Sequence, residues 1–209
     1  LVDEYHVISK KTEEQLLTLT NKKITSIPFW VDPKLFYEIS DKKNLKKELG
    51  FAEKDYLIGS FQRDSEGSNL DTPKLIKGPD IFLKLVSEKF SKNENVRVVL
   101  AGKRRNYLIN KLTEKKIPFE YFEMVDTVKL NKLYNALDLY IVSSRIEGGP
   151  QAILECAITK TPILSTDVGV ASEILHSNSI YSIDDFNKSK VDIDYAYQNA
   201  QLYKLPDGM

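Results

Sequence analysis

The stretch LDLYIVSSRIEGGPQAILECAITKTPILST, residues 137–166, contains two short apolar runs with a helical pattern between them. The runs 137–144 and 162–166 are hydrophobic without polar alternation, as in strands that are covered on both faces. Between them, residues 150–159 repeat apolar side chains at the spacing of an amphipathic helix. Two strands joined through such a helix are typical of a parallel pair. The stretch therefore predicts a strand–helix–strand unit of an α/β fold.

The same alternation of strands and helices extends upstream to residue 55. We expect further strands at 55–61, 96–102 and 119–123, and helices at 78–90, 106–115, 127–137 and 169–175. This order predicts a doubly wound parallel sheet with helices on both faces. The flanking segments are less regular, with a strand expected at 4–9, a helix at 11–19, a strand running into a proline-rich loop over 24–36, a polar helix at 41–50 and a terminal helix at 192–204.

Composition narrows the classes of function. The 209 residues include 42% hydrophobic and 29% charged side chains, which is ordinary for a globular protein with a sizeable core. Thirty basic residues balance thirty acidic ones, which argues against a dedicated nucleic-acid-binding protein. The one cysteine, Cys156, has no partner for an internal disulfide, and we expect it in the core. No apolar run reaches the length of a membrane span.

Charged residues and glycines follow several of the predicted strands. Arg63 and Lys77 come after the first strand of the sheet, and Gly102 comes after the second, followed by the run 103–105 of Lys and Arg. Asp167 follows the last strand. Ligands of doubly wound sheets bind outside the carboxyl ends of the strands, so these loops predict a site at one edge. We expect the cations of 103–105 to form a solvated loop.

The segment EGGPQ, residues 147–151, is the sharpest local feature. Pro150 suits the first position of a helix, and the two glycines before it allow a close approach of backbone to ligand. The free amides of Gly148, Gly149, Gln151 and Ala152 then form an anion site at the positive end of the helix. Glu155 lies roughly 7–8 Å along the axis from Pro150, too deep for a capping acid. A solvated helix face remains the alternative for Glu155.

At this point the chain resembles the retaining glycosyltransferases of family 4, which have the GT-B fold. The resemblance rests on SSRIEGGPQAILECAITKTPILSTDVGVASEIL, residues 143–175, with its two glutamates separated by seven residues. Supporting matches in the right order are GSFQRDSE, PKLIKGPDIF, NALDLYIVSS and SIPFWVDPKLF. The chain departs from the family at Lys160 and Val170, where glycine is common.

The resemblance implies the C-terminal, nucleotide-sugar-binding half of such an enzyme, a Rossmann-like domain. It implies that Arg63 and Lys77 hold the diphosphate of a nucleotide-diphosphate-sugar donor, that Glu147 binds the sugar near the reacting carbon and that Glu155 binds the ribose. The catalytic residues it implies are Glu147, Arg63 and Lys77, and the donor-binding residues are Glu155, Gly148, Gly149, Gln151, Ala152, Gly102 and Asp167. It implies neither a metal nor a further cofactor, and the chain has only two histidines, His6 and His176.

The implied organisation is a linker-proximal segment and start of the C-terminal domain over 1–50, the Rossmann-like domain over 51–190, and a C-terminal helix and tail over 191–209. The acceptor-binding N-terminal domain is then missing, so we expect the isolated chain to bind nucleotide weakly and to transfer little sugar. We expect a cytoplasmic protein of polysaccharide biosynthesis, with any peripheral membrane contact made by the missing half. Two alternatives stay open: a GT-B sugar-nucleotide epimerase, and a non-catalytic nucleotide-binding or interaction module.

Overall fold

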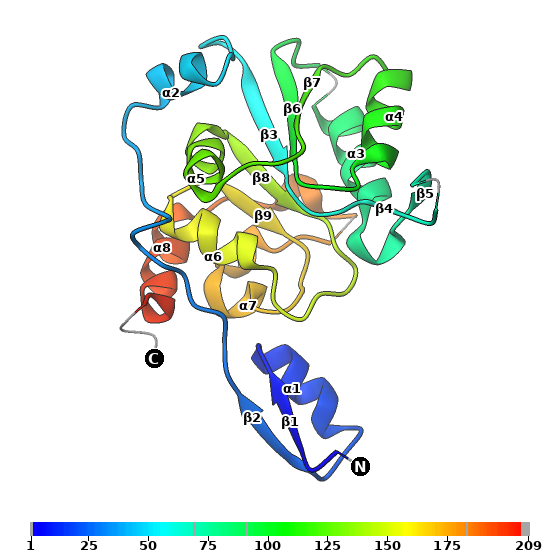
Figure 1. Ribbon diagram of the computed structural model, residues 1–209, viewed down its shortest axis with the longest axis vertical. Helices are drawn as coiled ribbons and strands as arrows, with labels where there is room; N and C mark the ends of the chain where they lie inside the picture. The colour runs from blue at the N-terminus through cyan, green and yellow to red at the C-terminus, as the bar shows by residue number, and fades with distance from the viewer. Residues whose placement is uncertain (1, 69, 91, 183, 206–209) are drawn as a thin grey trace.

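The centre of the fold is a sheet of five parallel strands (Figure 1). The computed structural model describes residues 2–68, 70–90, 92–182 and 184–205. In spatial order the strands are β7 (Phe119–Phe122), β6 (Val96–Ala101), β3 (Tyr56–Ser60), β8 (Leu139–Val142) and β9 (Ile163–Ser165). The chain winds outward from β3 to β7 and then returns to β8 and β9 on the other side. The expected doubly wound parallel sheet is therefore confirmed, and its strand order reverses between β3 and β8.

Helices cover both faces of this sheet (Figure 1). One face packs against α2 (Lys42–Glu48), α5 (Thr127–Ala136), α6 (Gln151–Ile158), α7 (Ala171–Ile174) and α8 (Ile193–Ala200). The other packs against α3 (Pro79–Lys89) and α4 (Asn106–Glu114). Neighbouring residues of β3, Leu57 and Ile58, belong to different cores and both are 0% exposed, which explains the continuous hydrophobicity of the strands. Cys156 is buried as expected. No described helix is long and apolar enough to cross a membrane.

Two local expectations are wrong. Helix α6 begins at Gln151, so Pro150 is the residue before the helix, with an extended ψ of 110°. The loop expected over 62–77 contains a short antiparallel pair, β4 (Ser65–Glu66) with β5 (Thr72–Pro73), and the 3-10 helix η1 (Leu75–Lys77). Strands of two residues have no measurable period, which is why the sequence does not predict them. The remaining 3-10 helices are Ser177–Ser179, Phe186–Lys188 and Gln201–Tyr203.

The N-terminal residues form a small unit of their own, below the main sheet in Figure 1. It consists of β1 (Glu4–Val7), α1 (Lys10–Leu17) and β2 (Lys23–Ser26), and the two strands pair in parallel. The start of α1 contacts the loop that follows β8 and helix α7: Ser9 Oγ donates to the carbonyl oxygen of Gly148 at 2.8 Å, and the backbone N–H of Lys10 donates to Glu173 Oε1 of α7 at 3.0 Å. The unit is therefore docked against the carboxyl edge of the main sheet.

Arg105 lies inside the fold and is 0% exposed, so the expected solvated loop over 103–105 is wrong at this position. Its Nε donates to Asp64 Oδ2 at 2.7 Å, and its Nη1 donates to the carbonyl oxygens of Ser60 at 2.6 Å and Ala101 at 3.0 Å. The pair therefore fastens together the loops that follow β3 and β6. Lys103 and Arg104 are exposed as expected.

Candidate functional site

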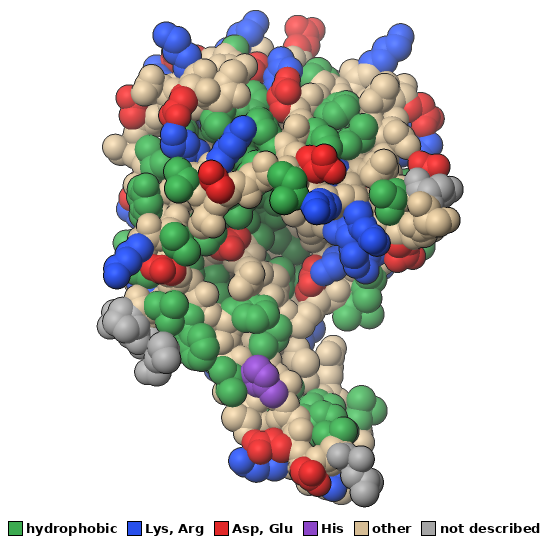
Figure 2. All heavy atoms as spheres, viewed as in Figure 1, with side chains coloured by type: hydrophobic (Ala, Val, Ile, Leu, Met, Phe, Trp, Pro, Cys, Tyr) green, Lys and Arg blue, Asp and Glu red, His purple; other side chains and the backbone are tan. Residues whose placement is uncertain are grey.

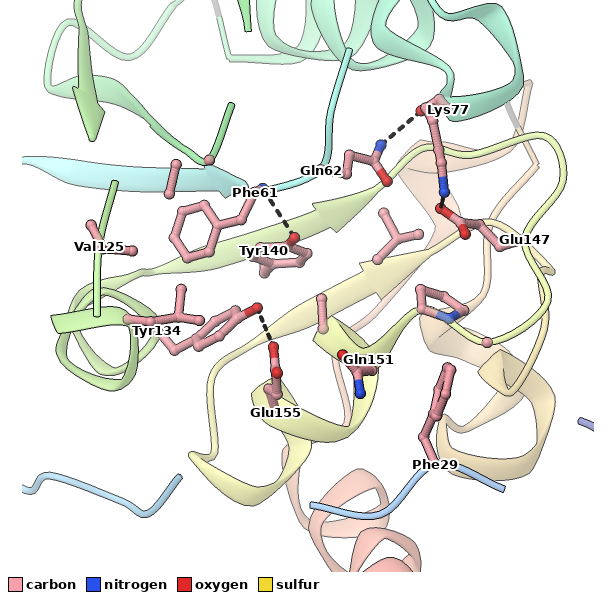
Figure 3. A pocket seen from close by; sticks show the side chains of 17 residues that line it. Phe29, Phe61, Gln62, Lys77, Val125, Tyr134, Tyr140, Glu147, Gln151 and Glu155 are labelled. Carbon is pink, nitrogen blue, oxygen red and sulfur yellow. Dashed lines mark hydrogen bonds and ion pairs between the residues drawn. The ribbon is translucent and has the colours of Figure 1, made fainter. Parts of the chain in front are cut away.

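A cavity of about 450 Å³ opens at the carboxyl ends of the strands, beside the point where the strand order reverses (Figure 3). Its walls come from the ends of β3, β6 and β8, from α5 and from the first two turns of α6. The lining residues are Phe29, Phe61, Gln62, Lys77, Ala101, Gly102, Val125, Leu130, Tyr134, Tyr140, Val142, Glu147, Gly149, Pro150, Gln151, Ala152 and Glu155. This is the position at which doubly wound sheets bind ligands.

One end of the cavity is ionic. Lys77 Nζ forms an ion pair with Glu147 Oε1, and both side chains are more than two-thirds buried. The hydroxyl of Ser144 lies 3.0 Å from Glu147 Oε1 and 3.0 Å from Gln62 Oε1, and the Gln62 amide donates to the carbonyl oxygen of Lys77 at 2.7 Å. The backbone of Lys77 leads into Gly78, which has the left-handed φ of 62° and is the N-cap residue of α3. This network holds an acid and a base side by side at the mouth of the cavity.

The other end is apolar and contains one acid. The Tyr134 hydroxyl donates a hydrogen bond to Glu155 Oε2 at 2.6 Å (Figure 3). Burial raises the pKa of Glu155, while the hydrogen bond from Tyr134 lowers it. Burial also raises the pKa of Tyr134 well above its ordinary value, so its hydroxyl stays a donor.

Aromatic rings form the floor between the two ends. The ring centroid of Phe61 lies 5.0 Å from that of Tyr134 and 5.3 Å from that of Tyr140. Tyr140 is held by the backbone N–H of Phe61, which donates to its hydroxyl at 3.0 Å. A ligand in this cavity therefore meets a carboxylate at each end and apolar rings in the middle. Such a surface suits an elongated molecule with hydroxyl groups and a flat ring.

The two glycines of the turn before α6 pack against the N-terminal unit. A Cβ atom on Gly149 would lie 3.0 Å from Cδ1 of Ile8, and one on Gly148 would lie 3.3 Å from it. The carbonyl oxygen of Gly148 accepts a hydrogen bond from Ser9 Oγ at 2.8 Å. These glycines therefore leave room for Ile8, a reason that the sequence does not reveal. Among the described residues nothing accepts a hydrogen bond from the amides of Gly149, Gln151 or Ala152.

The residues expected to form the site divide into two groups. Those that line the cavity are Lys77, Glu147, Glu155, Gly102, Gly149, Gln151 and Ala152. Three others do not line it. Gly148 turns its carbonyl to Ser9, and Asp167 Oδ2 forms an ion pair with Lys11 at 2.5 Å.

The third residue outside the cavity is Arg63, which is exposed and makes no ion pair within the described part of the chain. The loops that carry Arg63 and Arg104 are adjacent, because the N–H groups of Asp64 and Ser65 both donate to the carbonyl oxygen of Arg104. Figure 2 shows Lys and Arg side chains gathered on this part of the surface, beside the hollow. Positive charge therefore borders the cavity mouth.

Several residues of this site are not predicted by the sequence: Gln62 and Tyr134, which line the cavity, and Ser144, which contacts Glu147. Ser144 is the last residue of a predicted strand, 137–144, and that position is a usable signal. Tyr134 has none, because an aromatic residue on the buried face of a helix is typical of a core. Within the described ranges, no three His, Cys, Asp or Glu side chains gather closely enough to hold a metal ion.

Comparison with known proteins gives the family. Residues 68–191, more than half of the chain, match the family described as Glycosyl transferases group 1. The chain belongs to this family. The matched segment includes Lys77, the glycine turn and both acids of the cavity, Glu147 and Glu155. This group 1 glycosyl transferase therefore has its cavity largely within the segment that defines the family.

Among curated proteins, this group 1 glycosyl transferase is similar to the lipopolysaccharide core biosynthesis mannosyltransferase LpsB of Rhizobium meliloti (strain 1021). The two are 26% identical over 187 residues, which cover 84% of this chain and 50% of LpsB. The chain thus spans about half the length of this relative.

Solved structures confirm the fold as that of GT-B glycosyltransferase domains. Sucrose-phosphate synthase of Thermosynechococcus elongatus matches 97% of this chain and 54% of its own, with a TM-score of 0.75 and 15% identity. HepE of Anabaena, in complex with UDP and glucose, matches 97% of this chain and 59% of its own, with a TM-score of 0.73 and 17% identity. The C-terminal domain of LpcC, a group 1 family protein of Francisella tularensis, matches 82% of this chain and 93% of its own, with a TM-score of 0.57 and 21% identity.

Proposed function

We propose that this chain is the donor-binding half of a retaining glycosyltransferase of family 4, which binds a nucleotide-diphosphate-sugar and transfers its sugar to an acceptor. The observation that carries the proposal is the separation of the two acids within one cavity. Glu147 lies beside a cation at the ionic end, and Glu155 lies beside Tyr134 at the apolar end. Because the two acids have different partners, they are better placed to bind opposite ends of one donor than to share a proton as a catalytic pair.

In this proposal the nucleoside lies at the apolar end. Glu155 accepts hydrogen bonds from the ribose hydroxyls, and the base lies near Gly102, Val125 and Leu130, which line that part of the cavity. Carboxylates that accept two hydrogen bonds from neighbouring hydroxyls give both affinity and orientation. The name of the HepE complex, with UDP and glucose, supports a uridine nucleotide as the first donor to try.

The diphosphate lies at the ionic end. When the bond between the sugar carbon and the diphosphate oxygen breaks, negative charge develops on the leaving diphosphate. Lys77 and the free amides of Gly149, Gln151 and Ala152 are the groups of the cavity that stabilise this charge. Glu147, released from its ion pair with Lys77, then binds hydroxyl groups of the sugar. We propose that this charge stabilisation needs no metal ion.

Arg63 enters the proposal as a second cation for the diphosphate. Its side chain is exposed at the loop after β3 and does not line the cavity. Its role therefore requires the side chain to turn inward when a donor binds. Loops that close over a ligand in this way are common in enzymes of this kind. Asp167, paired with Lys11 outside the cavity, contributes through the docking of the N-terminal unit.

Binding calorimetry with UDP, GDP, ADP and their sugar conjugates tests this proposal. We expect one of the three nucleotides to bind, and Glu155→Ala to weaken that binding at least about tenfold, as expected for loss of a charged hydrogen-bond acceptor. If none of the nucleotides or sugar nucleotides binds, the donor-binding proposal is wrong and a non-catalytic interaction module becomes the better account.

A further inference from the structure

Tyr134 lies in α5, and its side chain is held in one orientation. The residue is 2% exposed, and its ring packs between Phe36, Phe61 and Tyr140, with centroid distances of 6.1, 5.0 and 5.6 Å. Its own carbonyl oxygen accepts a hydrogen bond from Thr161 Oγ1 at 2.9 Å, which fixes the backbone as well. A buried ring that packs against three other rings cannot change rotamer without displacing them.

The hydroxyl of Tyr134 points at one acid of the cavity (Figure 3). It donates to Glu155 Oε2 at 2.6 Å, and no described group donates to the other oxygen, Oε1. Both residues line the cavity. One carboxylate oxygen is thus held by the protein, and the second is available to a ligand.

We infer that Tyr134 is a positioning residue for donor binding, which holds one oxygen of Glu155 and leaves the second oxygen to accept hydrogen bonds from the hydroxyl groups of the ligand. This inference rests on the proposed function, because it assigns Glu155 to a nucleotide. It adds a residue on a different helix, whose hydroxyl acts only through Glu155.

The electrostatic surroundings of Glu155 leave Tyr134 as its main stabilising partner. Burial raises the pKa of Glu155, and the hydrogen bond from Tyr134 is the contact that lowers it. The other titratable groups that line this cavity or the pocket adjoining it, or flank Glu155 on α6, are Tyr140, Cys156, Lys77, Glu147 and Asp32. None of these donates a hydrogen bond to Glu155 in the described structure, and Lys77 is paired with Glu147.

The inference predicts a displaced pH profile. Loss of the Tyr134 hydroxyl removes the contact that lowers the pKa of Glu155, so a larger fraction of the carboxyl is protonated at a given pH. A protonated carboxyl is a poorer acceptor for ligand hydroxyls. As the pH is lowered, the variant without the Tyr134 hydroxyl therefore loses ligand binding at a higher pH than the wild type does.

The test is calorimetry between pH 5 and pH 8.5 with whichever of UDP, GDP and ADP binds the wild type most tightly. We expect Tyr134→Phe to bind about tenfold more weakly near pH 6, the usual effect of one hydrogen bond to a charged group. The difference in affinity between Tyr134→Phe and the wild type becomes smaller toward pH 8.5. Glu155→Gln binds the nucleotide weakly at every pH. Tyr181→Phe, which also removes a buried hydroxyl but in the opposite core, keeps the wild-type profile.

The outcomes separate the two hypotheses. If the wild type binds and Tyr134→Phe follows the same pH profile, Tyr134 only packs and the inference is overturned, while the proposed function stands. If Tyr134→Phe is weaker by the same factor at every pH, control of ionisation is overturned. If the wild type binds none of the three nucleotides, the proposed function itself fails.

Discussion

Glu155 shows how a buried acid that lines the cavity lowers the stability of its own fold. Its carboxyl is in an apolar part of the cavity, and burial raises its pKa above the ordinary value of 4.5. The folded protein therefore holds this proton more tightly than the unfolded chain does. As the pH rises from 4.5 through the higher pKa of the folded protein, the carboxyl ionises at an unfavourable position, and the free energy of unfolding falls.

Replacement of Glu155 by glutamine removes this penalty. We expect Glu155→Gln to be as stable as the wild type below pH 4.5 and more stable near pH 8, because the neutral amide does not ionise. Urea unfolding at both values measures the difference. Glu114→Gln, at an exposed position of α4, gains no stability at the higher pH. An equal effect of Glu155→Gln at both pH values would contradict this account.

The buried pair of Arg105 and Asp64 gives a second prediction at this scale. Asp64→Ala leaves a fully buried guanidinium without its acid, which typically costs about 3–5 kcal/mol. Chemical denaturation measures the loss. Asp185→Ala, which breaks the exposed ion pair with Lys188, serves as the matched control and has little effect. A loss after Asp64→Ala no larger than that of the control would show that the pair is not structural.

Arg105 also marks a limit of prediction from sequence. Lys103, Arg104 and Arg105 are chemically alike along the chain, and all three follow a strand where ligands bind. Only Arg105 is buried, because Asp64 and the carbonyl oxygens of two strands surround it. Those partners come together through the sheet, so residue type and spacing do not single Arg105 out.

At the scale of elements, the strands and helices of the sheet could be predicted to within about two residues at each end, as is usual for strongly patterned segments. Their apolar runs are continuous because both faces are covered. The hairpin of β4 and β5 could not be predicted from the sequence, because each of its strands has only two residues. The glycine turn was predicted as a ligand contact, and its packing against Ile8 depends on an element far away in sequence.

Gly78 connects η1, which carries Lys77, to the start of α3. Its φ is 62°, and a Cβ atom there would lie 1.8 Å from the carbonyl oxygen of Ser143. We expect Gly78→Ala to destabilise the fold severely and to displace Lys77. Gly50→Ala is the control: its φ is 86° but nothing lies within 4 Å, so only the backbone cost of about 1–2 kcal/mol applies. Thermal unfolding compares them, and equal losses would contradict the steric explanation.

At the scale of the whole molecule, the N-terminal unit is docked on the edge of the sheet that carries the cavity. Ser9 contacts the glycine turn, and Lys11 contacts Asp167. The chain nevertheless spans about half of the curated relative that it matches. The fold and the cavity acids could be predicted from the sequence, while the acceptor of the proposed transfer could not, because no residue pattern in this chain indicates its chemistry.

We therefore expect donor binding without transfer. The isolated chain, incubated with a sugar nucleotide that it binds, is expected to release no more nucleoside diphosphate than the buffer does, because we propose that this chain supplies the donor side alone. Chromatography of the products checks this. Turnover that is lost in Lys77→Ala would contradict the expectation and place a complete active site within these residues.

The central claim is that Glu155 and Glu147 hold opposite ends of one donor. The most direct measurement is calorimetry of one nucleoside diphosphate and its sugar conjugate with Glu155→Ala and Glu147→Ala. We predict that Glu155→Ala weakens both ligands about tenfold or more, whereas Glu147→Ala weakens only the sugar conjugate. Equal weakening of the free nucleotide by both variants, or no effect of either, would contradict the account.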